Sequence, residues 1–336
     1  MDETSSTKAL APVLERTLGR AGILTLNRPE AGNRLTPAMR ASLATTLQRH
    51  ERDREIYCTV LEAAQAAEGG SAAFCLGDDG EGYAGIADAA AGAWRIDRHG
   101  KPFVAMLRGP VAGAGLGLVL HGTHQVAGEA VTLAVPEVTA GTVPGAGLSL
   151  LLPDMPGQLG LFLALTGRPI DHGLAFDAGL LTHCVASRQF PTILAQLADA
   201  VPLDPVLDAL HEAPGRSSLA PHLDAIERCF GAETPAAIMA RLESTHGASA
   251  TWAAELAQEM RCLPPLALAV THWLLTTHRP RDLRAALGLE YRVAMNLLQT
   301  ADDPAPATDD RVEAMFAPLA SGELVLPSEP LAPSIN

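Results

Sequence analysis

The sequence predicts an α/β fold that is followed by a purely helical C-terminal region. Two observations support this prediction. Up to about residue 190, apolar stretches of strand length alternate with stretches of helical periodicity, as is typical of layered α/β proteins. Beyond that point only helical periodicity remains, and prolines separate one helical stretch from the next. A chain of 336 residues is also long enough to bury a sizeable core.

The N-terminal half carries several strand signals and one helix with a clear start. Thr36 is a typical N-cap residue, and Pro37 suits the first helical position. Apolar residues then recur at helical spacing as far as about Arg52. Strands are predicted at 13–17, 23–26, 57–61, 103–107 and 131–135.

The C-terminal half is predicted to contain only helices. These are expected at 191–200, 204–212, 221–229, 235–244, 250–261, 265–277, 281–300 and 309–316. The last residues are rich in proline, serine and alanine and are expected to be extended. We therefore divide the chain into a disordered N-terminus (1–10), a core (11–195), a helical region (196–318) and an extended tail (319–336).

Composition excludes several classes of function. The 38 acidic residues outnumber the 24 basic ones, which argues against nucleic-acid binding, because that needs a cationic surface. The N-terminal residues are polar, and no apolar run reaches the length of a membrane span, so we expect a cytoplasmic protein without a membrane partner. Five widely spaced cysteines without a C-x-x-C motif favour neither disulfides nor a metal site. Cys75 is interpreted as a buried structural thiol.

The stretch from Lys101 to Gly167 holds the strongest functional signal. An apolar strand runs into a glycine-rich turn at 109–117, which opens an apolar helix at 116–120. A second strand then delivers an isolated acid, Glu137, into a loop rich in glycine and proline. A helix start has unpaired backbone N–H groups, and these stabilise negative charge on a carbonyl oxygen. The pattern therefore indicates chemistry at a carbonyl group with one carboxylate nearby.

The glycines have two simpler interpretations. A dinucleotide-binding turn needs a third fingerprint glycine, but the spacing here is G-x-G-x-G and position 118 is Leu118. A close-packed turn without function would explain the glycines alone. It does not explain why Glu137 follows the next strand, so the functional interpretation is favoured.

Further motifs lie on both sides of this stretch, in a matching order. They are GILTLNRPEAGNRL at 22–35, FCLGDD at 74–79, His121–Gly122, IERCFGAETPAAIMARL at 226–242 and LGLEYR at 287–292. Over roughly residues 12 to 316, the chain resembles the crotonase (enoyl-CoA hydratase/isomerase) superfamily. Within it, the longer C-terminal part is similar to the 3-hydroxyisobutyryl-CoA hydrolase branch.

The resemblance implies a crotonase-like core, a spiral of β-β-α turns, and an acyl-CoA substrate. Coenzyme A would be part of the substrate, with no separate cofactor and no metal. The N–H groups of Asp78 and Ala114 would hold the thioester oxygen, and Glu137 would transfer a proton or attack the carbonyl. Arg34 is either a phosphate contact or an ordinary solvated arginine. The residues expected to contact substrate are Asn33, Arg34, Leu76, Gly77, Asp79, Gly113, Gly115, Gly117 and Gly145.

Three departures from the family pattern bear on the reaction. Hydratases carry a second glutamate where this chain has Gly117, and the hydrolases carry an aspartate where it has Gly145. Leu76 and Asp78 replace small uncharged residues, and an acid at 78 would oppose an oxyanion unless its side chain points away. Asp79, Asp154 and His121 are the nearby polar candidates to replace the missing acid. The sequence thus favours a hydrolase of 3-hydroxyisobutyryl-CoA type, with an isomerase or hydratase and a non-catalytic acyl-CoA binder as alternatives; homo-oligomerisation is left open.

Overall fold

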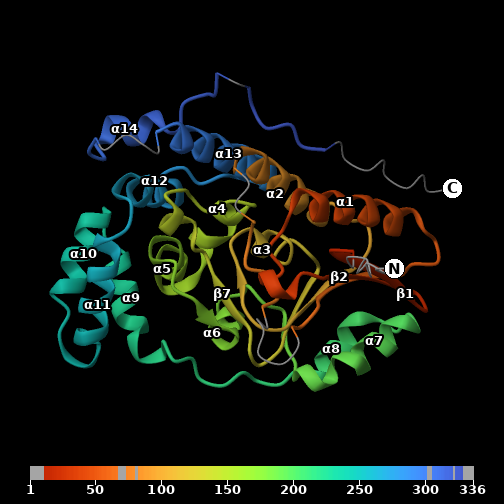
Figure 1. Ribbon diagram of the computed structural model, residues 1–336. Helices are drawn as coiled ribbons and strands as arrows, with labels where there is room; N and C mark the ends of the chain where they lie inside the picture. Colours follow the sequence, from red (N-terminus) through yellow and green to blue (C-terminus); the bar gives the residue numbers. More distant parts are fainter. Residues whose placement is uncertain (1–10, 67–72, 80–81, 301–304, 321, 328–336) are drawn as a thin grey trace, which may run out of the picture.

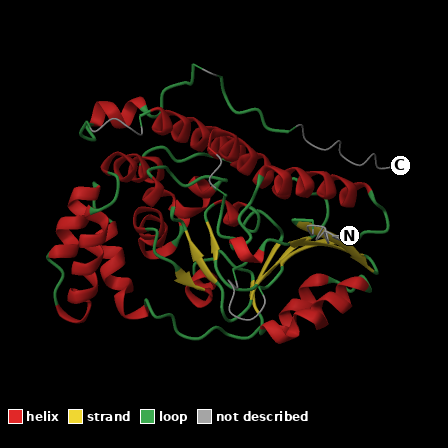
Figure 2. Cartoon of the chain, viewed as in Figure 1, coloured by secondary structure: helices red, strands yellow, loops and turns green. Residues whose placement is uncertain are grey.

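The fold consists of two β-sheets surrounded by helices (Figures 1 and 2). The structure is a computed structural model that describes residues 11–66, 73–79, 82–300, 305–320 and 322–327. The larger sheet has the order β1-β2-β3-β4-β6-β9, and the smaller one has the order β5-β7-β8. The strands are β1 Val13–Leu18, β2 Ala21–Leu26, β3 Cys58–Ala63, β4 Phe103–Leu107, β5 Val111–Ala112, β6 His124–Ala127, β7 Thr132–Ala134, β8 Ile170–Asp171 and β9 His183–Cys184.

The helices separate the strands in the first half and follow one another in the second. They are α1 Pro37–Arg52, α2 Gly82–Asp97, α3 Ala114–Gly117, α4 Leu148–Leu151, α5 Leu159–Thr166, α6 His172–Asp177, α7 Phe190–Ala198, α8 Leu203–Leu210, α9 Leu223–Phe230, α10 Pro235–Glu243, α11 Ala250–Arg261, α12 Pro265–Thr276, α13 Leu283–Gln299 and α14 Asp309–Ala314. Helix α1 begins as the sequence predicts, because the Thr36 side chain accepts a hydrogen bond from the Met39 N–H at 3.2 Å.

The larger sheet is buried on both faces apart from strand β1, whose side chains are mostly exposed. Apart from the antiparallel β1–β2 hairpin its strands are parallel. Side chains alternate along each strand, so Ile23, Val60 and Val104 face helices α7 and α8. Leu24 and Leu61 face the opposite side, where they join the main core with α1. Burial on both faces explains why these strands read as continuous apolar runs.

The C-terminal helices extend the main core and do not form a separate unit. Every residue of α5 is buried, and α9, α11 and α12 pack around that helix. Helix α13 lies along α2, as Figure 1 shows. The large apolar cluster joins residues of the sheets with residues of α9 to α12. The helical region is therefore a cover that completes the core.

Several details differ from the sequence-based expectations. The boundary at residue 195 falls inside α7, and α7 and α8 pack on the larger sheet, so both belong to the core. Helix α3 covers only Ala114–Gly117, because the chain turns irregularly after Leu118, and it is shorter than the expected helix. Helix α2 was not predicted, since its glycines lower helix propensity, and the short elements β5, β6, β8, β9, α4, α5 and α6 were not predicted either. The N-terminal segment 1–10 lies outside the described residues, while 322–327 form neither helix nor strand.

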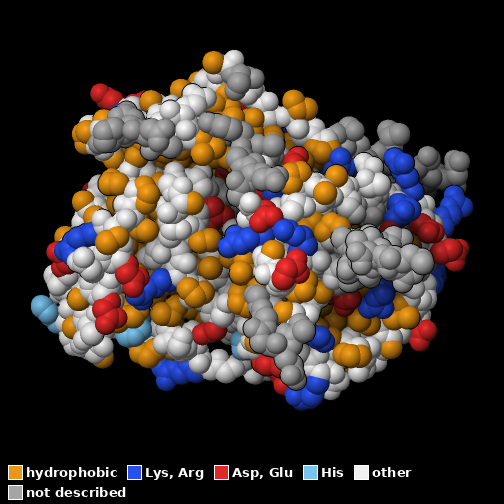
Figure 3. Space-filling model, in the orientation of Figure 1, with side chains coloured by type: hydrophobic (Ala, Val, Ile, Leu, Met, Phe, Trp, Pro, Cys, Tyr) orange, Lys and Arg blue, Asp and Glu red, His pale blue; other side chains and the backbone are white. Residues whose placement is uncertain are grey.

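Among the described helices, none is by itself long and apolar enough to cross a membrane. One bent pair, Leu148–Asp154 with Pro156–Thr166, reaches the length and composition together, with 112° between its halves. Leu148, Leu152 and Phe162 of this pair are buried in the core. On the face drawn in Figure 3, basic and acidic side chains lie close together, without a broad patch of one sign among the coloured side chains.

Candidate active site

Three short parallel segments bring the expected catalytic groups to one edge of the smaller sheet. Strand β5 pairs in parallel with β7, and Cys75 forms an isolated parallel bridge with Val111 of β5. The carboxyl ends of parallel segments lie at the same edge, so the residues that follow the three segments meet there. These residues are Asp78, Ala114 and Glu137.

The N–H group of Asp78 is directed toward the glycine turn. On the opposite side of its loop, the Leu35 N–H donates to the Gly77 carbonyl oxygen at 2.8 Å, and the Asp79 N–H donates to the Leu35 carbonyl oxygen at 3.2 Å. Because N–H groups alternate in direction along an extended segment, the N–H of Asp78 faces away from Leu35. It has no acceptor among the described residues.

The N–H group of Ala114 lies beside that loop. Ala114 is the first residue of α3, so its N–H has no acceptor within the helix, nor elsewhere in the described residues. A Cβ atom built on Gly77 would lie 3.7 Å from the Ala114 nitrogen, which shows how closely the two backbones approach. Two free N–H groups on adjacent segments are the arrangement that stabilises an oxyanion. The dipole of α3 contributes little, because the helix has a single turn.

The side chain of Asp78 is held by an ion pair with Arg40. Burial raises the pKa of Asp78, while the Arg40 guanidinium acts in the opposite direction. Arg34 supports the same loop, since its Nη1 donates to the carbonyl oxygens of Leu76 at 2.8 Å and Asp78 at 3.1 Å. The Asp78 carboxylate therefore serves the structure of the loop, with its charge balanced by a cation.

Glu137 opens a 3-10 helix, Glu137–Ala140, immediately after β7. Gly113 has φ of +53°, and a Cβ atom there would lie 3.3 Å from the Glu137 Oε1, so glycine permits the close approach. The Glu137 Oε2 is buried and has no hydrogen-bond partner among the described residues. Burial, with smaller contributions from the negative charges of Glu290 and Asp78, raises the pKa of Glu137 to about 8. A carboxyl group of this kind accepts and returns a proton near neutral pH.

This raised pKa makes the stability of the protein depend on pH. The pKa of Glu137 is about 8 in the folded protein and has an ordinary value of 4.5. The contribution of Glu137 to the free energy of unfolding is therefore fully present below pH 4.5 and is lost as the pH rises through 8. Glutamine at this position has no charge to bury. We therefore expect the stability of Glu137→Gln, taken relative to that of the parent, to be roughly 3–5 kcal/mol higher at pH 9 than at pH 5. Urea unfolding of both proteins at the two pH values measures the difference. A difference that does not change with pH would contradict the buried-carboxyl interpretation.

The loop 141–147, which follows Glu137–Ala140, is fixed by the buried side chain of Glu290 and the half-buried side chain of His121. Glu290 of α13 accepts hydrogen bonds from the N–H groups of Gly147 and Ser149, both at 2.7 Å. His121 Nε2 donates to the Ala146 carbonyl oxygen at 2.6 Å. Burial raises the pKa of Glu290 to about 7 and lowers that of His121. The helical region thus holds one wall of the site in place.

The two glycines that depart from the family pattern have different surroundings. A Cβ atom on Gly117 would lie 2.4 Å from the Cβ of Ala146, so this position has no room for a glutamate. A Cβ atom on Gly145 would have no atom within 4 Å, and its backbone is not in the left-handed region. The site therefore excludes a second carboxylate at 117 but leaves space for one at 145.

Most of the predicted site residues line one cavity of about 510 Å³. Those in its wall are Arg34, Leu76, Gly77, Asp78, Gly113, Ala114, Glu137 and Gly145. Gly115 and Gly117 lie behind it, where Gly115 packs against Cys75. Cys75 itself is buried, and burial raises its pKa to about 12, so it remains a thiol.

Two residues that were expected to contact substrate are engaged within the protein instead, Asn33 with backbone groups and Asp79 with the side chain of Arg28. Asn33 is fully buried, and its side chain bonds to the backbone of Arg28, Ala64 and Ala73. Asp79 is exposed and pairs with Arg28 at 2.9 Å. Neither lines the cavity, so both act as supports of the site in this structure.

The sequence offered three polar groups to replace the missing hydrolase aspartate, and none of them lines the cavity. Asp79 is engaged by Arg28, and His121 by the Ala146 carbonyl oxygen. Asp154 pairs with Arg279 at 2.6 Å on the surface. Among the described residues in the cavity wall, Asp78 and Glu137 are the carboxylates, and Asp78 is committed to Arg40.

Sequence reasoning missed two residues of this site. Arg40 lies on α1 and belongs to no motif. The signal available in the sequence was the acid at Asp78, because a half-buried carboxylate needs a cation nearby. Glu290 lies in LGLEYR, which marked the resemblance but gave no role to the acid. Its position on the buried face of a predicted helix was the available signal, because a buried carboxylate needs hydrogen-bond donors.

Comparison with known proteins agrees with this geometry. The family model for enoyl-CoA hydratase/isomerase matches residues 21–306. The 3-hydroxyisobutyryl-CoA hydrolase of Xenopus tropicalis, described as mitochondrial, is 31% identical over 309 residues, which cover 84% of this chain and 77% of the relative. The human protein of the same name is 29% identical over 321 residues, covering 88% and 80% of the two chains.

Solved structures share the fold over nearly the whole chain. A carnitinyl-CoA dehydratase from Mycobacterium thermoresistibile superposes with a TM-score of 0.83 at 30% identity, covering 94% of this chain and 98% of its own. An enoyl-CoA hydratase from Rhodobacter sphaeroides gives a TM-score of 0.80 at 30% identity, covering 94% and 100%. The crotonase-like core with a helical C-terminal region is thereby confirmed. The chain belongs to the enoyl-CoA hydratase/isomerase family.

Proposed function

We propose that this protein is an acyl-CoA thioester hydrolase of 3-hydroxyisobutyryl-CoA hydrolase type. The observation that supports this most is the buried Glu137 Oε2, which lacks a partner among the described residues and lines a cavity with the two free N–H groups. The names of the relatives support the choice of substrate class. Coenzyme A is part of the substrate, and the reaction needs no separate cofactor or metal.

The proposed reaction uses Glu137 as the single proton carrier. The thioester oxygen accepts hydrogen bonds from the N–H groups of Asp78 and Ala114. Glu137 takes a proton from water as the water oxygen bonds to the carbonyl carbon. The carbon–sulfur bond then breaks, and Glu137 returns the proton to the leaving thiolate. Carboxylic acid and free coenzyme A are the products.

A double-bond isomerase is the second candidate, because it also needs one carboxylate that moves a proton between two carbons of the acyl chain. Hydration with two carboxylates is disfavoured, since Ala146 occupies the space next to Gly117. A non-catalytic acyl-CoA binder is the third candidate, and Gly145 is its main support. The cytoplasmic location and the oligomeric state stay predictions.

Release of free coenzyme A tests the proposal and has an expected pH profile. With 3-hydroxyisobutyryl-CoA as substrate, kcat/KM is expected to rise about tenfold per pH unit up to about pH 8 and then level off, because only ionised Glu137 accepts a proton. A thiol-trapping assay between pH 6 and pH 9 measures it. Absence of coenzyme A release at every pH would exclude the hydrolase. Formation of a shifted double bond in 3-enoyl-CoA would then identify the isomerase.

A further inference from the structure

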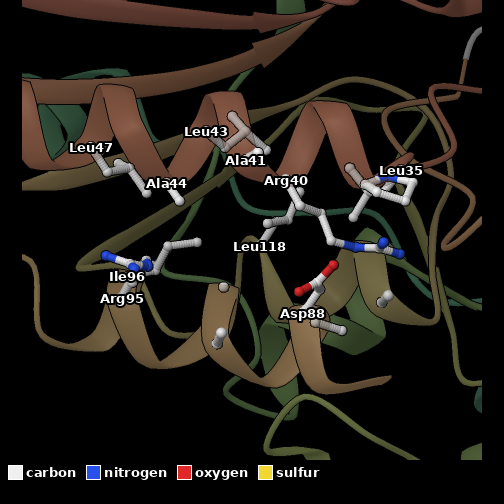
Figure 4. Close-up of a pocket in the computed structure, with 15 residues that line it drawn as sticks. Leu35, Arg40, Ala41, Leu43, Ala44, Leu47, Asp88, Arg95, Ile96 and Leu118 are labelled. Atoms are coloured by element: carbon white, nitrogen blue, oxygen red, sulfur yellow. The ribbon is translucent and has the colours of Figure 1, made fainter. Parts of the chain in front are cut away.

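A second, smaller cavity of about 170 Å³ lies between helices α1 and α2, next to the catalytic one. The two cavities share Ala89 and Ala114 in their walls, so the smaller one begins where the thioester carbonyl would lie. Its walls are mainly apolar, with Leu43 of α1 on one side and Leu118 beyond α3 (Figure 4). It therefore offers space for part of an acyl group.

Arg40 is the exceptional residue in this wall. Its side chain is 8% exposed, and one guanidinium nitrogen, Nη2, pairs with Asp78. Its Nε and Nη1 are buried and have no hydrogen-bond partner among the described residues. A buried cation with unused N–H groups is costly, so an acceptor from a ligand is the natural partner.

The position of Arg40 is set by the same contacts that shape the oxyanion hole. The parallel bridge between Leu35 and Asp78 ties the start of α1 to the loop that carries the first N–H donor. The capping of α1 by Thr36 then fixes the direction of the helix four residues before Arg40. The unused N–H groups are therefore held at a constant place relative to the loop that carries the first N–H donor.

The charges around Arg40 decide what kind of acceptor fits. Asp78 already pairs with it, and the Asp88 carboxylate on α2 points toward it in Figure 4. A second cation, Arg95, lies farther along α2. An anionic ligand group would thus face two carboxylates near Arg40. A neutral oxygen avoids this repulsion and still accepts hydrogen bonds.

We propose that Arg40 is a specificity-determining residue that donates hydrogen bonds to a neutral oxygen, such as a hydroxyl group, on the acyl part of the thioester. This inference rests on the proposed function for the substrate class. By this inference, Arg40 selects among acyl-CoA molecules those whose acyl group has an oxygen near the carbonyl. A binding measurement tests it independently of hydrolysis.

The experiment compares three ligands that differ at one group. Isobutyryl-CoA, 3-hydroxyisobutyryl-CoA and methylmalonyl-CoA carry a methyl, a hydroxymethyl and a carboxylate at the same carbon. Dissociation constants are measured by calorimetry on the Glu137→Gln protein, which prevents turnover. We expect the hydroxylated ligand to bind about tenfold more tightly than isobutyryl-CoA, because a charged donor gains a partner, and methylmalonyl-CoA to have no such advantage.

Variants then assign the preference to Arg40. Arg40→Met is combined with Asp78→Asn, so that no unpaired carboxylate remains beside the oxyanion hole, and the tenfold ratio is expected to fall to about one. Arg52→Met makes the same change at the exposed end of α1 and is expected to keep the ratio.

Each negative outcome has its own meaning. Equal binding of isobutyryl-CoA and 3-hydroxyisobutyryl-CoA by the Glu137→Gln protein would overturn the inference without any further variant, as would an unchanged ratio in the double variant. Tightest binding of methylmalonyl-CoA would also overturn it, in favour of an anion site. Failure of the parent to release coenzyme A would instead remove the proposed hydrolysis while the binding ratio still stood.

Discussion

Glu137→Gln is expected to lower coenzyme A release by about 10³-fold while leaving the affinity for acyl-CoA within a few-fold of the parent. Glutamine has nearly the same shape as glutamate, so the cavity and the two N–H donors stay in place. It cannot accept a proton from water, however, and the proposed mechanism has no other proton carrier in the wall. The loss should therefore appear in kcat and not in binding.

The measurement pairs the thiol-release assay with calorimetry of the product coenzyme A. Glu290→Gln is the informative comparison, because it also removes a buried carboxylate but one that contacts the loop at Gly147 and Ser149 and does not line the cavity. If the rate fell as much for Glu290→Gln as for Glu137→Gln, the loss of activity would arise from displacement of the loop and not from the loss of a proton acceptor. An unchanged rate in Glu137→Gln would reduce the protein to a binder or assign the chemistry elsewhere.

The raised pKa of Glu137 connects this catalytic prediction with the stability prediction. Removal from water makes the carboxyl group a base suited to neutral pH, and the same burial makes its ionised form unfavourable in the folded protein. A variant that gains stability at high pH and loses activity there would show both effects with one substitution. Such a trade-off is common where a reactive group is held in an apolar site.

The sequence was sufficient for most of the architecture because its signals are local. The eight helices after residue 190 were predicted within a few residues, since proline and Thr-Pro pairs mark their starts, as in the Thr234 cap of α10. Helix α2 was not predicted because its glycines lower helix propensity, and the short elements between Val111 and Cys184, apart from α3 and β7, were not predicted either. The packing of α7 and α8 on the larger sheet also escaped, because it depends on which face of a strand each helix covers.

The site was predictable in part for the same reason. Glu137, Asp78 and Ala114 each follow a strand or turn with a recognisable motif, which is why the sequence pointed to them, and the structure places all three in the wall of one cavity. Arg40 and Glu290 act through contacts with residues 38 and more than 140 positions away, and one sequence does not reveal such pairs. Asn33 was expected to contact substrate because it lies in a family motif, whereas its burial shows a role in holding the backbone.

Gly145→Asp is expected to raise hydrolysis by about 10²-fold, the second large effect that the structure suggests. The resemblance to the hydrolase branch implies an aspartate at this position, and the structure has room for one. A Cβ atom at 145 would meet no atom within 4 Å, and the backbone there is not in the left-handed region that disfavours side chains. Gly145 lines the same cavity as Glu137, so a carboxyl group there would reach the reacting water or the leaving sulfur.

The pH profile would show whether the new acid acts on the reaction. A second carboxylate close to Glu137 raises the pKa of the pair, because the two negative charges repel, so the rise of kcat/KM should move above pH 8. Gly145→Asn adds a side chain of the same shape without the charge and is expected to give neither the faster rate nor the shift. If the aspartate variant is no faster than the asparagine variant, the missing acid does not limit this protein. Glu137 alone would then set the rate, and the departure at 145 would reflect a reaction that needs only one carboxylate.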